Sequence, residues 1–274
     1  MRSSRALDPG TIGEHRRRLP SRPRMPYGRA MHTVPFGFRE VEHAEKRALV
    51  GDVFAGVADR YDLMNDLMSA GLHRAWRRDL MLRMTRRDAR RTLDLAGGTG
   101  DMAFRIRRRF AGATVVVTDA SAEMLEVGRR RALDRGLVHE PGWICADAAA
   151  LPFADRSFSQ VVCAFGLRNF AELGRSLREV RRVLRPGGRF LALEFAPQSQ
   201  CLDSLYERYL FEVVPWLGDA VTGRRDAYSY LAESIRRFLP PEAMSTELGE
   251  AGLGTVRLHR YAAGIACLYS ARRT

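Results

Sequence analysis

Apolar and polar positions divide the chain into a helical first part and a second part of alternating elements. From residue 40 to 84 apolar side chains recur at helical spacing, and Gly71 interrupts the pattern, so separate helices are expected on either side of it. From residue 92 short apolar runs alternate with longer amphipathic stretches. This alternation is typical of strands joined by helices, and it predicts a parallel, doubly wound sheet.

The predicted elements follow one another in regular order after residue 91. Strands are expected at 92–96, 114–118, 142–146, 159–164, 189–195, 253–260 and 263–270. Helices are expected at 101–110, 121–135, 173–184 and 241–251, and a Pro-Gly-Gly sequence follows the third of these. The expected fold class is therefore α/β, with a mainly parallel sheet of about seven strands, helices on both faces and additional N-terminal helices.

A long amphipathic helix is expected after Pro197. Its apolar positions run from Leu202 to Leu217 at spacings of three and four residues. Two interpretations remain open for this helix. It packs on the core of the protein, or it forms a lid over an apolar substrate or faces a membrane.

The composition indicates a soluble globular protein. The chain has 274 residues, of which 46% are hydrophobic, and no apolar run approaches the roughly 18 residues that a membrane span requires. Its four cysteines form no C-x-x-C pair. They are expected to be reduced core residues and not to have a metal or redox role. Reduced cysteines fit a protein of the cytoplasm.

The net charge of +13 arises almost entirely from arginine. Lys46 is the only lysine among the 45 basic residues, a bias that resembles GC-rich coding more than selection for phosphate contacts. Such a surface nevertheless attracts anionic lipids and RNA. Residues 1–33 are predicted to be a disordered basic leader, with a targeting segment as the alternative, and Met25 and Met31 are further candidate start sites.

The strongest motif is the sequence TLDLAGGTG at residues 92–100. An apolar strand carries Asp94 and ends in Gly97, Gly98 and Gly100, and a helical pattern starts at Asp101. Glycines permit positive φ angles and a close approach of the ligand to the backbone. The motif therefore predicts a strand, a tight turn and a helix N-terminus that present backbone N–H groups to a nucleotide.

Three acids follow this turn. Asp101 opens the first helix, where capping alone can explain it. Asp119 ends the next strand and is placed to accept hydrogen bonds from both ribose hydroxyls of an adenosine. Asp147 ends the third strand and could reach an adenine amino group, unless it is only a turn residue. These acids fit a nicotinamide dinucleotide as well as S-adenosylmethionine, whereas Asp94 within D-L-A-G-G-T-G favours S-adenosylmethionine.

The whole succession of motifs resembles the class I S-adenosylmethionine-dependent methyltransferases, which have a Rossmann-like fold. Four segments, at 36–38, 54–76, 164–170 and 228–238, are similar to the ubiquinone/menaquinone biosynthesis C-methyltransferases of the UbiE type. The similarity starts near residue 34. It implies one methyltransferase domain, 34–274, made of N-terminal helices (34–90), a cofactor-binding core (91–196), a helical substrate lid (197–240) and a C-terminal helix with strands (241–274).

The resemblance also implies a set of cofactor contacts. S-adenosylmethionine would act as the methyl-donor cosubstrate, and no metal is expected. Its contacts would come from Gly97, Gly98, Thr99 and Gly100 in the turn, Asp119 at the ribose, Asp147 and Ala148 at the adenine, and Ala164. The family often has serine at the position of Ala164, so only a backbone contact is expected there, and one neutral hydrogen bond is worth roughly 0.5–1.5 kcal/mol.

The implied reaction is C-methylation of a polyprenylated hydroquinone ring. Arg168 is expected to hold a phenolate by charge, although its guanidinium cannot readily act as a base. Asn169 and Tyr61 are expected to orient the ring hydroxyls or a water. His73 is a further candidate base, and a structural role is its alternative. Tyr61 could instead be a core residue, and Arg168 could instead form a surface ion pair.

The expected partners are the polyprenyl hydroquinone and the membrane surface, at the cytoplasmic face of the membrane. A homodimer or a quinone-biosynthesis complex is also compatible with the sequence. Nucleic acid is not expected, because no RNA-binding module or aromatic residues interleaved with basic ones are evident. The alternative functions are methylation of another small molecule or of RNA, and a non-catalytic scaffold.

Overall fold

The structure is a computed structural model that describes residues 33–56, 61–137, 141–197 and 203–274. The described residues belong to one compact unit. Apart from Thr33, the predicted leader lies outside the described residues.

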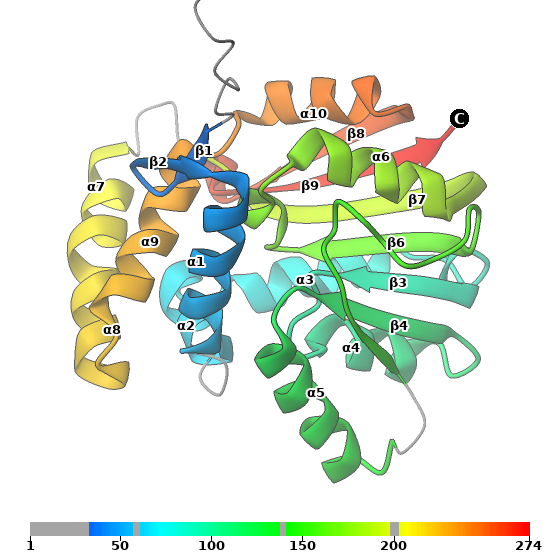
Figure 1. The fold of residues 1–274 in the computed structure, drawn as a ribbon, viewed down its shortest axis with the longest axis horizontal. Coiled ribbons are helices and arrows are strands. Elements are labelled where there is room, and N and C mark those ends of the chain that lie inside the picture. The colour runs from blue at the N-terminus through cyan, green and yellow to red at the C-terminus, as the bar shows by residue number, and fades with distance from the viewer. Residues whose placement is uncertain (1–32, 57–60, 138–140, 198–202) are drawn as a thin grey trace, which may run out of the picture. The chain divides into compact units, whose positions relative to one another are not determined.

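A seven-stranded sheet forms the centre of the described chain (Figure 1). Its strand order is β5-β4-β3-β6-β7-β9-β8. The five strands from β3 to β7 are parallel to one another, whereas β9 is antiparallel to both β7 and β8. This arrangement confirms the expected fold class. The strands are β3 (Arg91–Leu95), β4 (Thr114–Asp119), β5 (Gly142–Cys145), β6 (Phe158–Ala164), β7 (Leu184–Phe195), β8 (Leu253–Tyr261) and β9 (Ala266–Arg273).

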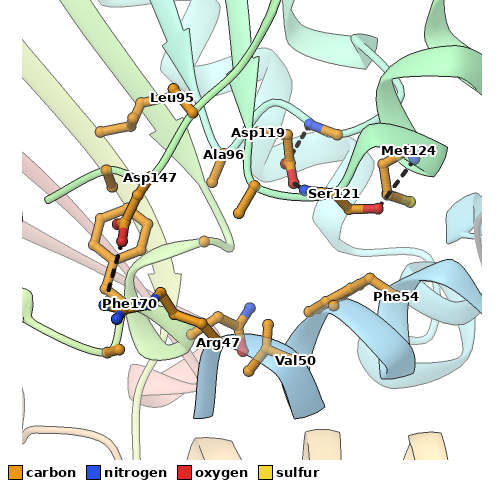
Figure 2. Close-up of a pocket in the computed structure, with 18 of the residues that line it drawn as sticks. Arg47, Val50, Phe54, Leu95, Ala96, Asp119, Ser121, Met124, Asp147 and Phe170 are labelled. Carbon is orange, nitrogen blue, oxygen red and sulfur yellow. Dashed lines mark hydrogen bonds and ion pairs between the residues drawn. The ribbon is translucent and has the colours of Figure 1, made fainter. Parts of the chain in front are cut away.

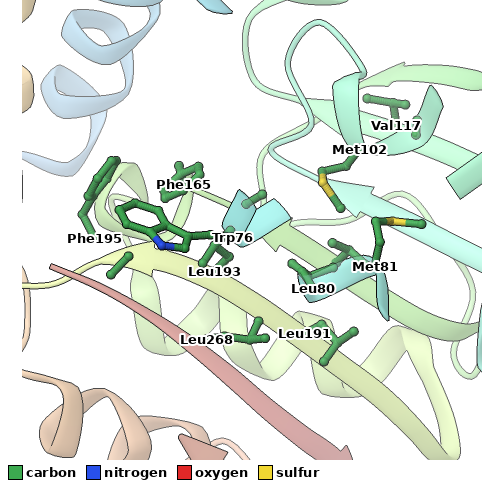
Figure 3. Close-up of a cluster of buried hydrophobic side chains, with 14 of the residues drawn as sticks. Trp76, Leu80, Met81, Met102, Val117, Phe165, Leu191, Leu193, Phe195 and Leu268 are labelled. Atoms are coloured by element: carbon green, nitrogen blue, oxygen red, sulfur yellow. The ribbon is translucent and has the colours of Figure 1, made fainter. Parts of the chain in front are cut away.

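Helices cover both faces of the sheet because its central strands are apolar on both sides. On one face of β7, Leu191 and Leu193 pack with Trp76 and Leu80 from α3 (Figure 3). The residues of β7 that alternate with them point to the opposite face of the sheet, where they pack in the core under α6 and α10. The first face carries α3 (His73–Leu82), α4 (Asp101–Arg109) and α5 (Ala122–Asp134), and the second carries α6 (Leu173–Val183) and α10 (Pro241–Glu250).

The remaining helices gather at one end of the sheet (Figure 1). The long helix expected after Pro197 is present from Asp203 to Thr222, with the five-residue π-helical stretch η4 between α7 and α8, whereas Leu202 lies outside the described residues. The elements of this layer are α1 (His43–Ala55), α2 (Tyr61–Ser69), α7 (Asp203–Arg208), η4 (Tyr209–Val213), α8 (Val214–Thr222) and α9 (Arg225–Arg237).

A β-hairpin that the sequence pattern did not predict precedes these helices. Strands β1 (Thr33–Phe36) and β2 (Arg39–Glu42) pair antiparallel around Gly37, whose φ is +57°. The expectation of helices from residue 34 is therefore wrong up to residue 42. The hairpin is held from outside, since the ring of Phe36 stacks on Tyr230 of α9 with 4.2 Å between the centroids. A contact so distant along the chain leaves no local periodic signal.

Candidate functional site

The turn after β3 needs its glycines for steric reasons. A Cβ on Gly97 would lie 2.7 Å from Val117, and one on Gly100 would lie 2.5 Å from Trp143. Gly98 and Gly100 also have positive φ angles, +53° and +79°. The turn therefore packs directly against β4 and the start of β5, as its glycine-rich sequence suggested.

Asp119 ends β4 and faces this turn. Its Oδ2 accepts a hydrogen bond from the Gly98 N–H at 2.9 Å, and its Oδ1 accepts one from the Ser121 N–H at 3.0 Å. Ser121 in turn caps α5, where its Oγ accepts from the Met124 N–H. Burial raises the pKa of Asp119, and the backbone donors oppose that shift. The carboxylate is thus fixed between the glycine turn and α5.

A cavity opens at the carboxyl ends of the parallel strands, between them and α1 (Figure 2). Five of the predicted site residues line it: Gly98, Asp119, Asp147, Ala148 and Asn169. The other lining residues are Arg47, Val50, Gly51, Phe54, Leu95, Ala96, Ala120, Ser121, Met124, Ala146, Phe165, Gly166, Phe170 and Ala171. Most of the walls are apolar, and the carboxylates stand among them.

Helix α1 supplies a wall of this cavity that the sequence pattern did not indicate. The Nη1 of Arg47 lies 3.4 Å from the Oδ2 of Asp147 (Figure 2) and 3.3 Å from the Oε1 of Glu172, so Arg47 links α1 to two loops of the core. Val50 and Phe54 lie on the same face of the helix. Their helical spacing was visible in the sequence, but it could not show what that face covers.

Two residues of the cavity have strained backbones. Ala96, after β3, has a φ of +50°, and Phe165, after β6, has a φ of +67°. Residues with a Cβ rarely adopt this left-handed region, and such strain is concentrated at functional sites. The loops that follow the two central strands are therefore shaped around the cavity.

Four residues predicted to contact a cofactor do not line the described cavity. Gly97 and Gly100 shape the turn, and Ala164 is buried at the end of β6. The hydroxyl of Thr99 accepts a hydrogen bond from Arg131 at 3.0 Å. Direct contacts from these four residues stay predictions.

Arg168 has a different environment from the one expected. Its Nη1 lies 2.7 Å from the Oε1 of Glu194, and the two side chains are 2% and 0% exposed. The guanidinium also donates to the Phe165 carbonyl and to Ser234. Arg168 therefore forms a buried ion pair, not a surface one. Among the described residues, Arg168 is also not part of the lining of the cavity.

The other catalytic candidates lie in different environments. Asn169 lines the cavity, and its Oδ1 accepts a hydrogen bond from the Tyr230 hydroxyl at 3.1 Å. Tyr61 is the first residue of α2, but its side chain lies outside the described residues. His73 is buried with its Nδ1 3.0 Å from the Ser69 hydroxyl, and burial, with Arg77, lowers its pKa to about 4. The arrangement favours a structural role for His73.

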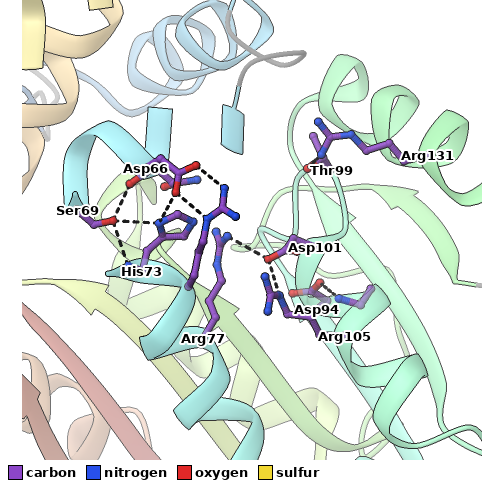
Figure 4. A network of polar contacts seen from close by, with 12 residues as sticks. Asp66, Ser69, His73, Arg77, Asp94, Thr99, Asp101, Arg105 and Arg131 are labelled. Carbon is purple, nitrogen blue, oxygen red and sulfur yellow. Dashed lines mark hydrogen bonds and ion pairs between the residues drawn. The ribbon is translucent and has the colours of Figure 1, made fainter. Parts of the chain in front are cut away.

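A polar network continues behind the glycine turn (Figure 4). Asp101 opens α4 and accepts from Arg77 at 3.0 Å and from Arg105 at 2.9 Å. Asp94 is buried, and its Oδ2 accepts from the Ala103 N–H at 3.0 Å. Its Oδ1 has no partner among the described residues, and burial raises its pKa to about 7. An unsatisfied buried carboxylate oxygen is costly, so it indicates a place for a polar ligand group.

Comparisons with known proteins connect this chain to one family. Residues 33–273 match the ubiE/COQ5 methyltransferase family. The ubiquinone/menaquinone biosynthesis C-methyltransferase UbiE of Paracoccus denitrificans is 48% identical over 236 residues, which cover 86% of this chain and 94% of that protein. The UbiE protein of Bradyrhizobium sp. is 47% identical over 247 residues, covering 88% and 97% of the two chains.

Solved structures resemble this one in fold. An S-adenosylmethionine-dependent methyltransferase of Thermotoga maritima matches with a TM-score of 0.58 at 15% identity, over 82% of this chain and 100% of that one. The [4+2]-cyclase SpnF matches with a TM-score of 0.55 at 18% identity, over 83% and 96%. Because one neighbour is a cyclase, fold alone does not define the reaction. The sequence match is far more specific, and the chain belongs to the ubiE/COQ5 methyltransferase family.

Proposed function

We propose that this protein methylates a ring carbon of a polyprenylated benzoquinol or naphthoquinol in ubiquinone or menaquinone biosynthesis, or in both, with S-adenosylmethionine as the methyl donor. The observation that carries the proposal is the cavity at the carboxyl edge of the sheet, where Asp119 and Asp147 stand beside apolar walls. The names of the most similar relatives support the choice of substrate class.

The residues present fit S-adenosylmethionine. Asp119 offers a fixed carboxylate to ribose hydroxyls, and Asp147 with Ala148 offers polar groups to the adenine. Asp94 has an unpartnered oxygen beneath the glycine turn, where an amino group could donate to it. When bound, S-adenosylmethionine supplies an electrophilic methyl group, so the protein itself needs no strong nucleophile.

The chain's own residues would exclude water and orient the ring. Phe54, Met124 and Phe165 form apolar parts of the cavity wall, which suit an aromatic ring. Asn169 has a side-chain amide that can still donate to a ring oxygen, because its Oδ1 accepts from Tyr230. A ring oxygen held in this way as a phenolate makes the neighbouring ring carbon nucleophilic.

Arg168 and Tyr61 are also proposed to contribute to the reaction. Arg168 would act on the cavity through the turn that it anchors on Glu194, since its guanidinium is already paired. Tyr61 would contribute a hydroxyl that orients the substrate or a water. Homodimer formation or assembly with other quinone-synthesis enzymes also stays a proposal.

A polyprenyl tail would keep the substrate in a lipid bilayer, so the enzyme would work at the membrane surface. Among the described residues, no helix is both long and apolar enough to cross a bilayer. Two large apolar side chains, Phe38 and Trp216, are 56% and 61% exposed, and the net charge is +13. Binding to vesicles should therefore increase with anionic lipid and decrease with salt. Equal binding to neutral and anionic vesicles would contradict this part of the proposal.

The test of the proposal is methyl transfer in vitro. Purified protein would be incubated with a short-tail demethylated quinol and S-adenosylmethionine carrying a labelled methyl group, and products would be identified by mass spectrometry. We expect the label on a ring carbon, and we expect Asn169→Ala to reduce kcat by roughly tenfold or more. Label on oxygen, or methylation of RNA but not of the quinol, would refute the assignment.

A further inference from the structure

The only lysine of the chain lies buried behind the cavity wall. Lys46 is on α1, with 4% of its surface exposed, in a protein whose other basic residues are all arginines. Its Nζ donates to the carbonyl oxygen of Phe170 at 3.1 Å and to that of Arg168 at 3.4 Å. A buried ammonium requires such partners to offset its desolvation. No carboxylate of the described residues forms an ion pair with it.

The two carbonyls belong to the end of a short 3₁₀ helix, Leu167–Asn169. Carbonyls at a helix C-terminus lack partners within the helix and carry partial negative charge, so a cation is favourable there. Asn169 lies between the two residues that Lys46 binds. Any shift of this pair of carbonyls would therefore move the side chain of Asn169 at the cavity wall.

The same turn is anchored from two other directions. The backbone N–H and the guanidinium of Arg168 bind Glu194 at the end of β7, and the Asn169 side chain binds Tyr230 of α9. Lys46 adds the connection to α1. Because the next residue, Arg47, faces the cavity and contacts Asp147, one helix contacts both the turn and the predicted adenine end of the cavity.

We propose that Lys46 is a positioning residue, whose ammonium group holds the carbonyls of Arg168 and Phe170 and thereby fixes Asn169 at the cavity wall. Lysine suits this place because its compact charge fits between two carbonyls, whereas a guanidinium is a larger planar fork. The consequence for catalysis rests on the proposed function. The consequence for the turn itself does not.

Hydrogen exchange tests the effect on the turn. The amides of Asn169 and Phe170 donate to Gly166 and Leu167 within the turn, both at 3.1 Å. In Lys46→Met, which keeps the side-chain volume but removes the donors, these two amides should exchange about tenfold faster or more, while amides of β7 and β9 stay as they were.

Arg189→Met is the matched control. Arg189 on β7 is also largely buried, and it donates to the Arg83 carbonyl and to Ser270, away from the cavity. This variant should leave the amides of Asn169 and Phe170 unchanged. The proposal is overturned if Lys46→Met leaves the turn amides as protected as before, or if it accelerates exchange uniformly through the protein, as a general loss of stability would.

A double-mutant cycle tests the effect on catalysis. Lys46→Met alone should lower kcat by roughly tenfold with less than about a threefold change in S-adenosylmethionine affinity, but it should add little to the loss caused by Asn169→Ala. Independent, multiplying losses would show that Lys46 does not act through Asn169. If the unaltered protein methylates no quinol, the proposed function fails, and the hydrogen-exchange comparison still decides the role of Lys46.

Discussion

Replacing Asp119 by alanine should weaken S-adenosylmethionine binding more than any other single change in the cavity. The carboxylate stands at the end of β4, fixed by the N–H groups of Gly98 and Ser121, and it lines the cavity. A ribose with two hydroxyls would donate two charge-assisted hydrogen bonds to it. Each such bond is worth about 1.5–3 kcal/mol, and part of this is lost to desolvation.

The expected loss for Asp119→Ala is about 2–4 kcal/mol, which corresponds to a roughly 30- to 700-fold higher Kd for the cofactor. The same change removes the acceptors of two backbone donors. It should therefore also lower the free energy of unfolding by about 1–3 kcal/mol. The two effects are separable, because affinity can be measured well below the unfolding temperature.

Isothermal titration calorimetry with S-adenosylhomocysteine gives the affinity without turnover, and chemical denaturation gives the stability. The control is Asp155→Ala, which removes an exposed carboxylate that pairs with Arg182 and does not line the cavity. It should leave the Kd unchanged. A folded Asp119→Ala protein with an unaltered Kd would show that the acid at the end of β4 does not contact the cofactor.

Three further predictions follow from buried charges. Burial raises the pKa of Asp94 to about 7, so the folded state binds this proton more tightly than the unfolded chain does. The contribution of Asp94 to the free energy of unfolding should therefore fall as the pH rises from about 4 to about 7. Urea denaturation of Asp94→Asn should show that this part of the pH dependence is lost. Arg168→Ala should destabilise the protein by about 3–5 kcal/mol in the same assay, since it leaves Glu194 buried and unpaired, and Arg168→Met with Glu194→Leu should recover most of that loss. Burial lowers the pKa of Lys46 to about 8, although the charge of Glu40 opposes the shift. Because Lys46 is the only lysine, ¹⁵N-lysine labelling yields one side-chain signal, which should titrate near pH 8. Titration near pH 10.5 would contradict the burial of Lys46.

The fold was largely predictable because its signals are local. Each parallel strand is a short apolar run, and the helices between the strands show their own period, so element order and sheet type followed directly. Asp119 and Asp147 were also predictable as cavity residues, since the carboxyl ends of parallel strands share one edge of the sheet.

The contacts that were missed all join residues far apart in the sequence. Arg47 reaches Asp147 across 100 positions, and the hairpin around Gly37 is held by α9. The sequence suggested that the charge of Arg168 could bind a substrate oxygen. In the structure, Glu194, 26 residues further on, is its ion-pair partner. A basic residue in a motif indicates a cation, but only its three-dimensional neighbours show whether that charge is already balanced.

If this protein methylates a quinol ring in the cell, the quinones that cells make without it should differ from the normal ones. The gene would be deleted, lipids would be extracted, and quinones and their precursors would be identified by mass spectrometry, with the deletion complemented by the unaltered gene or by Asp119→Ala. We predict that the mature quinone disappears, that a precursor lighter by one methylene group accumulates, and that only the unaltered gene fully restores the mature quinone. A normal quinone profile in the deletion strain would show that this protein is not the methyltransferase of quinone biosynthesis in these cells.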